Sequence, residues 1–314
     1  MTGDALKFLT LVDGKERQTL DFVLPGLLSG NVGLIVGQGA VGKSMLALSI
    51  GLGVATGRKV AGGLWTPGGV GPVVIIAGED SEPIIRERLY WLRQAEKIDD
   101  EEAAEIGAQL RIASGYGVDL RIVTRNGETG PFYDELRRIC EGHRLAVLDP
   151  LVLFCDGDEN DNAAMTRVMR ALAGIARETG CTIVLLHHVS KSGAGDREAW
   201  TAARGASAIT TAARWQVSLM PPTKDDLAEL GIAADLRRYW VRVAVDKSNY
   251  CETPDPQWLR RERGGVLVAA DPPGHALASA TKAANGSFVL PDANRSRLEL
   301  LYGPTSGGHD DADF

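Results

Sequence analysis

The sequence predicts an α/β fold with a doubly wound, mostly parallel central sheet, helices on both faces and antiparallel late strands. Short apolar runs rich in β-branched residues recur along the chain, as in strands buried on both faces of a parallel sheet. Helix candidates separate these runs, and such alternation favours an α/β fold. The late runs 239–246 and 265–269 follow each other without a long helix, which predicts an antiparallel end to the sheet.

The predicted strands lie at 32–36, 73–77, 145–148, 181–186, 215–219 and 239–245. The predicted helices lie between them, at 43–56, 82–97, 131–141, 162–179 and 204–213. The fourth helix is marked by apolar residues spaced three and four apart, namely Met165, Val168, Met169, Leu172 and Ile175. Gly180 follows directly and is expected to end this helix.

The composition excludes some classes of protein. Hydrophobic residues make up 44% and charged residues 24% of the 314, so a collagen-like or wholly disordered chain is excluded. The net charge of −7 argues against a basic coat for nucleic acid but allows DNA held by a few loops. Four scattered cysteines form no CxxC pair, which indicates neither a zinc site nor a disulfide framework. With no signal-peptide pattern and no apolar run long enough to cross a membrane, we expect a cytoplasmic protein.

The alternating pattern covers most of the chain, and we expect one core domain over residues 1–270, of which 1–19 form an N-terminal arm. From Asp271 onward Ala, Gly, Ser, Asn, Pro and Asp dominate, which predicts a mostly disordered tail over 271–314. The tail ends in acidic residues and a terminal Phe314. Such an end either increases solubility, inhibits the core or docks a replication partner.

A phosphate-binding loop (P-loop) follows the first long strand, which is therefore called the P-loop strand. The pattern G-x-x-x-x-G-K-[ST] is matched by Gly37, Gln38, Gly39, Ala40, Val41, Gly42, Lys43 and Ser44, and Met45 comes next. A strand before the loop and a helix after it are the context in which backbone N–H groups bind ATP phosphates. Lys43 is then expected to bridge the β- and γ-phosphates and Ser44 to ligate Mg²⁺. The alternative is a glycine turn that matches by chance.

Carboxylates at other strand ends complete a predicted ATPase site. Asp149 ends the run 145–148 and is expected to hold the magnesium ion, acting mainly through its water shell. Glu79 follows the run 73–77 and can act as general base if its strand lies beside the P-loop strand. The alternative for Glu79 is a helix-start acid, a role that suits Asp80 better.

Two further residue types are candidates for contact with the nucleotide. His187 and His188 end the run 181–186, and only one of them can face the site because side chains alternate along a strand. We expect His188 to face the γ-phosphate and His187 to be packed structurally. Arg88, on the helix after Glu79, is either a nucleotide contact or part of a solvated helix face.

In this order the motifs resemble the RecA-like ATPase core and, more narrowly, plasmid RepA-type hexameric replicative DNA helicases. The resemblance runs from about Leu20 to Val268 and includes the double histidine, Arg204-Gly-Ala-Ser207 and Lys247-Ser-Asn-Tyr250. It implies a RecA-like fold and a homo-hexamer with the nucleotide at subunit interfaces. It further implies that Arg214 is an arginine finger and Lys247 a second cation, both acting on the neighbouring subunit. The alternative is that both are ordinary surface cations.

The same resemblance implies single-stranded DNA as a partner, held by loops after two of the strands. The second loop offers Lys191 and Arg197 to phosphates. The first loop contains Asp156, Asp158, Glu159 and Asp161, which would repel them.

Two functions therefore remain: a ring motor that unwinds DNA in plasmid- or phage-type replication, or an ATPase switch without unwinding. A strand-exchange recombinase is less favoured, because no separate DNA-binding domain is visible.

Overall fold

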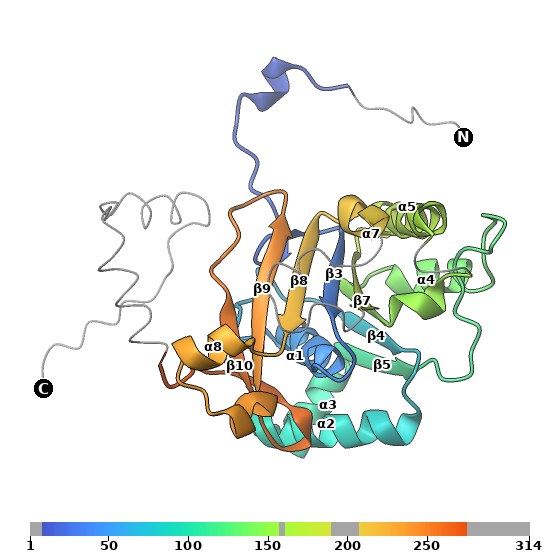
Figure 1. Ribbon diagram of the computed structural model, residues 1–314. Coiled ribbons are helices and arrows are strands. Elements are labelled where there is room, and N and C mark those ends of the chain that lie inside the picture. Colours follow the sequence, from blue (N-terminus) through green and yellow to red (C-terminus); the bar gives the residue numbers. More distant parts are fainter. Residues whose placement is uncertain (1–7, 157–160, 190–206, 275–314) are drawn as a thin grey trace, which may run out of the picture.

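A nine-stranded mixed sheet organises the chain, in the order β11-β10-β9-β8-β3-β7-β6-β4-β5 (Figure 1). The computed structural model describes residues 8–156, 161–189 and 207–274. The sheet strands are β3 (Val32–Gly37), β4 (Val73–Ala77), β5 (Leu110–Ser114), β6 (Leu145–Asp149), β7 (Thr182–His188), β8 (Trp215–Met220), β9 (Trp240–Ser248), β10 (Gln257–Arg261) and β11 (Leu267–Ala269). Strands β3 to β8 pair in parallel, and β9, β10 and β11 are each antiparallel to their neighbours. The predicted fold class is confirmed.

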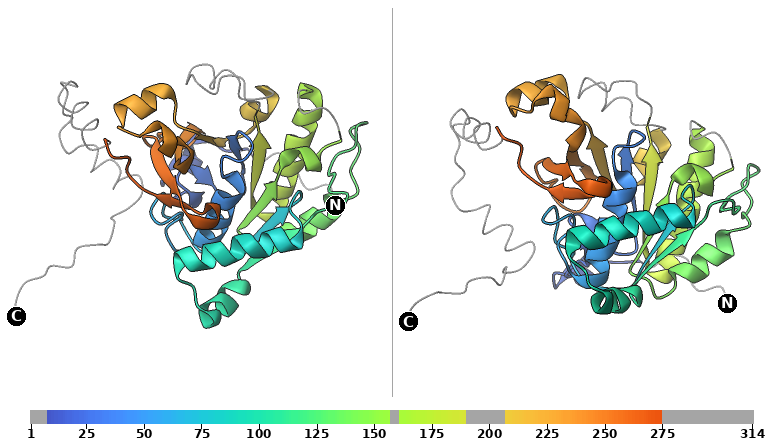
Figure 2. Two further views of the ribbon diagram at one scale, coloured as in Figure 1. Left: turned by 60° about the horizontal axis from the view of Figure 1, so that its bottom comes forward. Right: turned by 90° about the horizontal axis from the view of Figure 1, so that it is seen from below.

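Helices cover both faces of the sheet (Figure 2). One face carries α1 (Lys43–Thr56), α2 (Glu82–Glu96) and α3 (Asp100–Gly107), and the other carries α4 (Tyr133–Cys140), α5 (Asn162–Thr179) and α7 (Ser207–Ala212). Alternate side chains of β6 enter two separate cores: Leu145 and Val147 join the core under α1, whereas Ala146 and Leu148 join the core under α5. Burial on both faces explains why these strands are continuous apolar runs.

Several elements lack the pattern from which the others were predicted. Strand β5 lies at the sheet edge with much of its length exposed, so Leu110–Ser114 carries no continuous apolar run. Strand β10 contains only two apolar residues between polar ones. The short helices α3 and α8 (Lys224–Glu229) were likewise not expected. The predicted helix 204–213 is present at Ser207–Ala212, and 204–206 lie outside the described residues.

The two ends of the described chain differ. Residues 8–20 are exposed and extend away from the sheet, with Leu11 99% accessible (Figure 1). They include a short 3₁₀ turn (Leu11–Gly14) and lead into the hairpin of β1 (Phe22–Leu24) and β2 (Leu27–Leu28). At the other end Gly274 N donates to Leu230 O at 2.7 Å, next to α8, and the predicted tail from 275 lies outside the described residues. Among the helices that the structure describes, none combines the length and the apolar character needed to span a membrane.

Burial of His187 near the end of β7 should make the stability of the fold depend on pH. Its side chain is enclosed, and burial, helped by the charges of His188 and Lys43, lowers the pKa of His187 from 6.5 to about 4. At a pH between about 4 and 6.5, His187 is protonated in the unfolded chain but not in the folded chain. The free energy of unfolding should therefore fall by up to about 3 kcal/mol as the pH drops from 6.5 to 4.

Denaturant titrations at pH 7 and pH 4.5 measure this loss. His187→Gln should lose less stability than the wild type over the same interval, since it removes the titrating ring. His143→Gln, a histidine outside the site, is the matched control. Equal losses for the wild type and His187→Gln would show that His187 is not the source.

Candidate functional site

The loop between β3 and α1 has a backbone that two of its glycines make possible. Gly42 caps α1 with φ of +111°, and a Cβ there would lie 2.8 Å from Leu267 Cδ1. A Cβ on Gly37 would lie 2.9 Å from Leu219 O. No side chain caps the start of α1, so its first N–H groups remain available to an anion at the positive end of the helix dipole.

Lys43 is almost fully buried at the start of α1. Its Nζ donates to Gly37 O and Gln38 O, both at 2.8 Å, and lies 3.3 Å from His188 Nδ1. Burial lowers the pKa of Lys43 to about 8, against the opposing influence of Asp149 and Glu79. The ammonium group is thus held by carbonyl dipoles, which a phosphate oxygen can replace as a stronger, charged acceptor.

Ser44 and Asp149 meet across the gap between α1 and β6. Ser44 Oγ donates to Asp149 Oδ2 at 2.6 Å, and Asp149 is only 8% exposed. Burial raises the pKa of the Asp149 carboxyl, while the Ser44 hydrogen bond acts in the opposite direction. A hydroxyl and a carboxylate are the oxygen ligands that Mg²⁺ uses in nucleotide sites. The pair therefore fits the predicted magnesium site.

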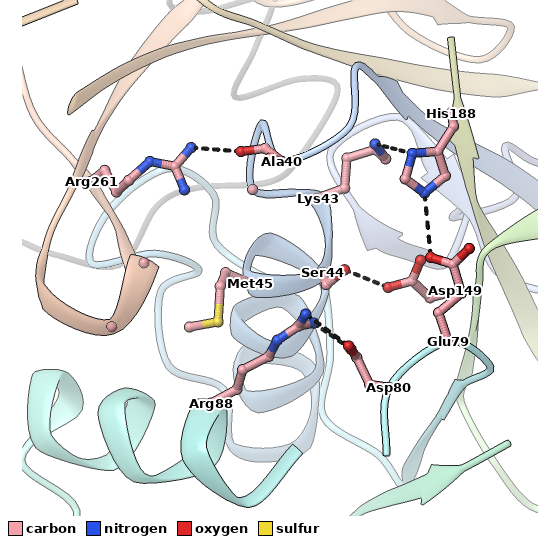
Figure 3. A pocket seen from close by; sticks show the side chains of 13 residues that line it. Ala40, Lys43, Ser44, Met45, Glu79, Asp80, Arg88, Asp149, His188 and Arg261 are labelled. Atoms are coloured by element: carbon pink, nitrogen blue, oxygen red, sulfur yellow. Dashed lines mark hydrogen bonds and ion pairs between the residues drawn. The ribbon is translucent and has the colours of Figure 1, made fainter. Parts of the chain in front are cut away.

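Glu79 reaches the site by a different route from the one expected. Its strand does not lie beside the P-loop strand, because β7 and β6 separate β4 from β3. Strand β4 instead pairs with β6, and Gly78 N donates to Asp149 O at 2.7 Å. This pairing brings Glu79 beside the magnesium-site residues, with Oε2 4.0 Å from His188 Nε2 (Figure 3). The His188 ring thus stands between Lys43 and Glu79, whereas His187 is buried.

Arg88 lines the same cavity, which has a volume of about 380 Å³ and also contains Lys43, Ser44, Glu79 and Asp149. Its guanidinium pairs with Asp80 at 2.6 Å (Figure 3). Ser81, rather than Asp80, occupies the N-cap position of α2. Asp80 therefore holds Arg88 at the cavity wall, in addition to lying close to the start of the helix.

Three cavity residues were not predicted. Arg261, at the end of β10, donates through Nη2 to Val41 O at 2.8 Å and to Ala40 O at 3.3 Å. Gly264 and Gly265 form the turn to β11, and this turn packs against α2. Gly264 has φ of +65° and lies so close to Trp91 that no side chain fits there. The available signal was Arg263-Gly-Gly265 between the apolar pair Trp258-Leu259 and the apolar run 266–270, a pattern typical of a hairpin turn.

Arg214 and Lys247 lie away from this cavity. Arg214 directly precedes β8, and Lys247 pairs with Gln216 near the start of the same strand. The P-loop follows the opposite, carboxyl end of the parallel strands. Lys247 Nζ donates to Thr210 O at 2.9 Å and Thr211 O at 3.1 Å, and burial, together with the charge of Arg214, lowers the pKa of Lys247. Neither residue lines the P-loop cavity of its own chain.

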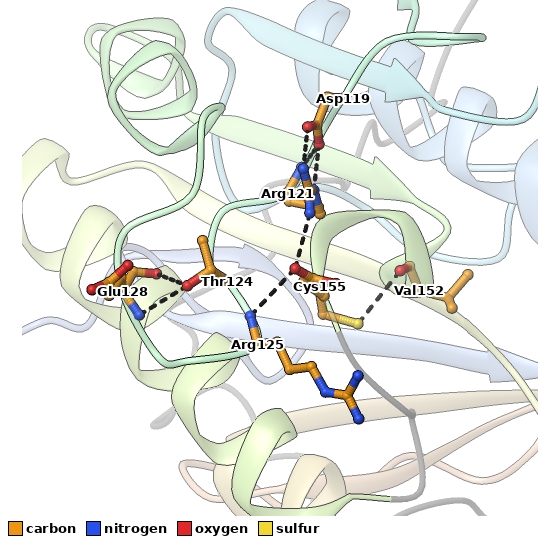
Figure 4. Close-up of polar contacts among 8 residues, drawn as sticks. Asp119, Arg121, Thr124, Arg125, Glu128, Val152 and Cys155 are labelled. Atoms are coloured by element: carbon orange, nitrogen blue, oxygen red, sulfur yellow. Dashed lines mark hydrogen bonds and ion pairs between the residues drawn. The ribbon is translucent and has the colours of Figure 1, made fainter.

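The acidic loop after β6 is partly neutralised. Asp156 accepts hydrogen bonds from Arg121 Nη1 at 2.9 Å and from Arg125 N at 3.4 Å. Figure 4 shows Arg121 and Arg125 on the segment that approaches this loop at Cys155. Asp161 accepts from Ala163 N at 2.8 Å and caps α5. Two of the four acids thus have structural roles, and Asp158 and Glu159 lie outside the described residues, as do Lys191 and Arg197.

Comparison with known proteins supports this description of the fold. The structure resembles a solved ATPase domain, with a TM-score of 0.51 and 15% identity over 77% of this chain and 86% of that chain. It also resembles a DnaB-like replicative helicase studied with primase, with a TM-score of 0.50 and 16% identity over 76% of this chain and 57% of that one. At these identities the likeness establishes a RecA-like fold, and the narrower RepA-type resemblance stays a prediction. A family model for an AAA domain (AAA_25) matches residues 4–194, more than half of the chain, and the protein therefore belongs to this AAA domain family.

Proposed function

We propose that the protein is a Mg²⁺-dependent ATPase that works as a homo-hexameric ring motor on single-stranded DNA and unwinds duplex DNA. The observation that carries the ATPase part is the convergence in one cavity of Lys43, the Ser44–Asp149 pair, Glu79 and His188. The residues come from α1 and from the carboxyl ends of three parallel strands, the edge at which open α/β sheets bind ligands.

The residues have separate roles in this proposal. The loop backbone and Lys43 bind the phosphates of ATP, with Met45 and Arg88 beside the rest of the nucleotide. Ser44 and Asp149 would hold Mg²⁺, which supplies neutralisation of the charge on the phosphates. Glu79 is 59% exposed and can orient a water molecule and take its proton as the water attacks the γ-phosphorus. The bond from the γ-phosphorus to the bridging oxygen then breaks, and ADP leaves with that oxygen. His188 lies between Lys43 and Glu79 and can relay the presence of the γ-phosphate between them.

The ring part of the proposal rests on Arg214 and Lys247. Both are cations at the end of the sheet where the parallel strands begin, opposite the P-loop, and neither lines the P-loop cavity of its own chain. In a ring built head to tail, that end of the sheet can face the P-loop of a neighbour. The pair would then supply positive charge to the neighbour's transition state. Release of Lys247 from the α7 carbonyls would accompany assembly.

The DNA part of the proposal rests on the resemblance and on the predicted cations Lys191 and Arg197. The acidic loop after β6 would repel DNA phosphates, but Arg121 partly neutralises that loop through Asp156. Stimulation of ATP hydrolysis by single-stranded DNA separates a motor from an ATPase switch, because a switch that does not use DNA shows no such dependence.

Replacing Glu79 tests its role as general base. Glu79→Gln should bind ATP normally but hydrolyse it at least about 10²-fold more slowly, because the amide cannot accept the proton. Asp80→Asn is the matched control, since the neighbouring Asp80 carboxylate pairs with Arg88 at the cavity wall. Steady-state phosphate release and binding of a fluorescent ATP analogue measure the two effects. Normal turnover of Glu79→Gln together with a slow Asp80→Asn would show that the other acid is the base.

Mixing two inactive variants tests the shared site. Lys43→Ala removes the phosphate contact and Arg214→Ala removes the cation offered to the neighbour. In mixed rings some interfaces combine an intact Lys43 with an intact Arg214, so activity should rise above that of either variant alone. Phosphate release measured at several mixing ratios shows whether activity rises. A mixture of two separate preparations of Lys43→Ala is the control. Unchanged activity, with a monomeric mass by light scattering in ATP and DNA, would contradict the ring.

A further inference from the structure

A second cavity of about 470 Å³ lies beside the P-loop. It is lined by loop residues 38–41 and by the 3₁₀ helix η3 (Ala234–Tyr239) with the start of β9. Arg237, Arg238, Arg261 and Tyr239 are among its lining residues. The lining contains no Asp or Glu among the described residues. The P-loop cavity differs, because it mixes Lys43 and arginines with three carboxylates.

The three arginines are held without ion pairs to any described residue. Arg237 Nε donates to Pro222 O at 2.7 Å, and Arg261 donates to the P-loop carbonyls. Arg238 lies over the Tyr239 ring, 4.9 Å from its centroid, and donates to the Tyr239 hydroxyl at 3.0 Å. In a chain with a net charge of −7, this is a local concentration of positive charge that favours an anion.

Cations beside an exposed aromatic ring are the combination that binds single-stranded nucleic acid, where bases stack on rings and phosphates meet arginines. The position of the cavity favours a strand over a free nucleotide. Val189, which follows β7, donates its N–H to Gly37 O at 3.2 Å. The loop predicted to hold DNA begins at Val189, so its first residue is hydrogen-bonded to the first residue of the P-loop, whose next four residues line this cavity.

We propose that the second cavity binds a nucleotide unit of single-stranded DNA, with Tyr239 stacking on a base and Arg238 contacting a phosphate. This inference rests on the proposed function but assigns a contact outside the two DNA loops. Arg261 connects it to the proposed ATP site, because this residue lines both cavities and its side chain donates to Ala40 O and Val41 O. DNA in one cavity and nucleotide in the other are then coupled, and the coupling is reciprocal.

Fluorescence anisotropy of a labelled oligo(dT) tests the site, in the presence of a non-hydrolysable ATP analogue. The oligo(dT) is about fifteen nucleotides long, which is within the site size of single-strand binding folds. Tyr239→Leu should weaken binding about tenfold, the usual effect of losing one stacked base, and Tyr239→Phe should not. Arg238→Ala should lower the slope of log affinity against log salt by about 0.7, the value of one phosphate contact on a single strand. Arg170→Ala, an exposed arginine on α5, is the control and should leave the slope unchanged.

The outcomes separate the inference from the proposed function. No oligo(dT) binding by the wild type contradicts both. Wild-type binding with unchanged affinity and salt slope in Tyr239→Leu and Arg238→Ala contradicts the second cavity alone. Weaker binding of a fluorescent ATP analogue, with oligo(dT) binding unchanged, would assign the cavity to the P-loop nucleotide and overturn the inference. Displacement of oligo(dT) by millimolar thymidine monophosphate would identify a free nucleotide as the ligand and overturn it as well. If Tyr239→Leu loses its thermal transition, Arg238→Ala decides.

Discussion

The site depends on a buried ammonium group with which no carboxylate of the described residues forms an ion pair. The Nζ of Lys43 is removed from water and held by two carbonyl oxygens at 2.8 Å, and its lowered pKa records the cost of that burial. Such a group is stable only if the backbone supplies dipoles at the correct distance. The tight turn from Gly37 to Gly42 does so, and β3 holds the turn in the middle of the sheet, between β7 and β8.

The parallel sheet then brings the other groups to this ammonium. Strand β7 pairs with β3 and β6 pairs with β7, so His188 and Asp149 approach Lys43 from the same end of the parallel strands. Glu79 arrives from one strand further out, through the pairing of β4 with β6. The late antiparallel strands add Arg261, which binds the outer carbonyls of the loop. Two sides of the P-loop are thus held by different parts of the fold, and each side adjoins its own cavity.

Local sequence carried enough information to predict the P-loop and the parallel strands other than β5, because a strand buried on both faces and a glycine-rich turn each leave a continuous pattern. Strand order left no such pattern. The route by which Glu79 reaches Asp149 depends on which strands pair, and the sequence left open whether its strand lies beside the P-loop strand. It does not, because β7 and β6 lie between them. Arg261 was missed because β10 carries few apolar residues and its contact is with residues more than two hundred positions away. The neutralisation of Asp156 was missed for the same reason, since Arg121 belongs to a distant segment.

Turnover of purified Lys43→Ala tests whether the cavity around Lys43 hydrolyses ATP with magnesium. Lys43 contacts the phosphates in the ground state and in the transition state, so its loss should weaken ATP binding as well as abolish hydrolysis. Phosphate release with and without Mg²⁺, in the wild type and in Lys43→Ala, is the measurement. We expect the wild type to release phosphate only when Mg²⁺ is present and Lys43→Ala to release none above background. Normal Mg²⁺-dependent turnover by Lys43→Ala would contradict hydrolysis in this cavity.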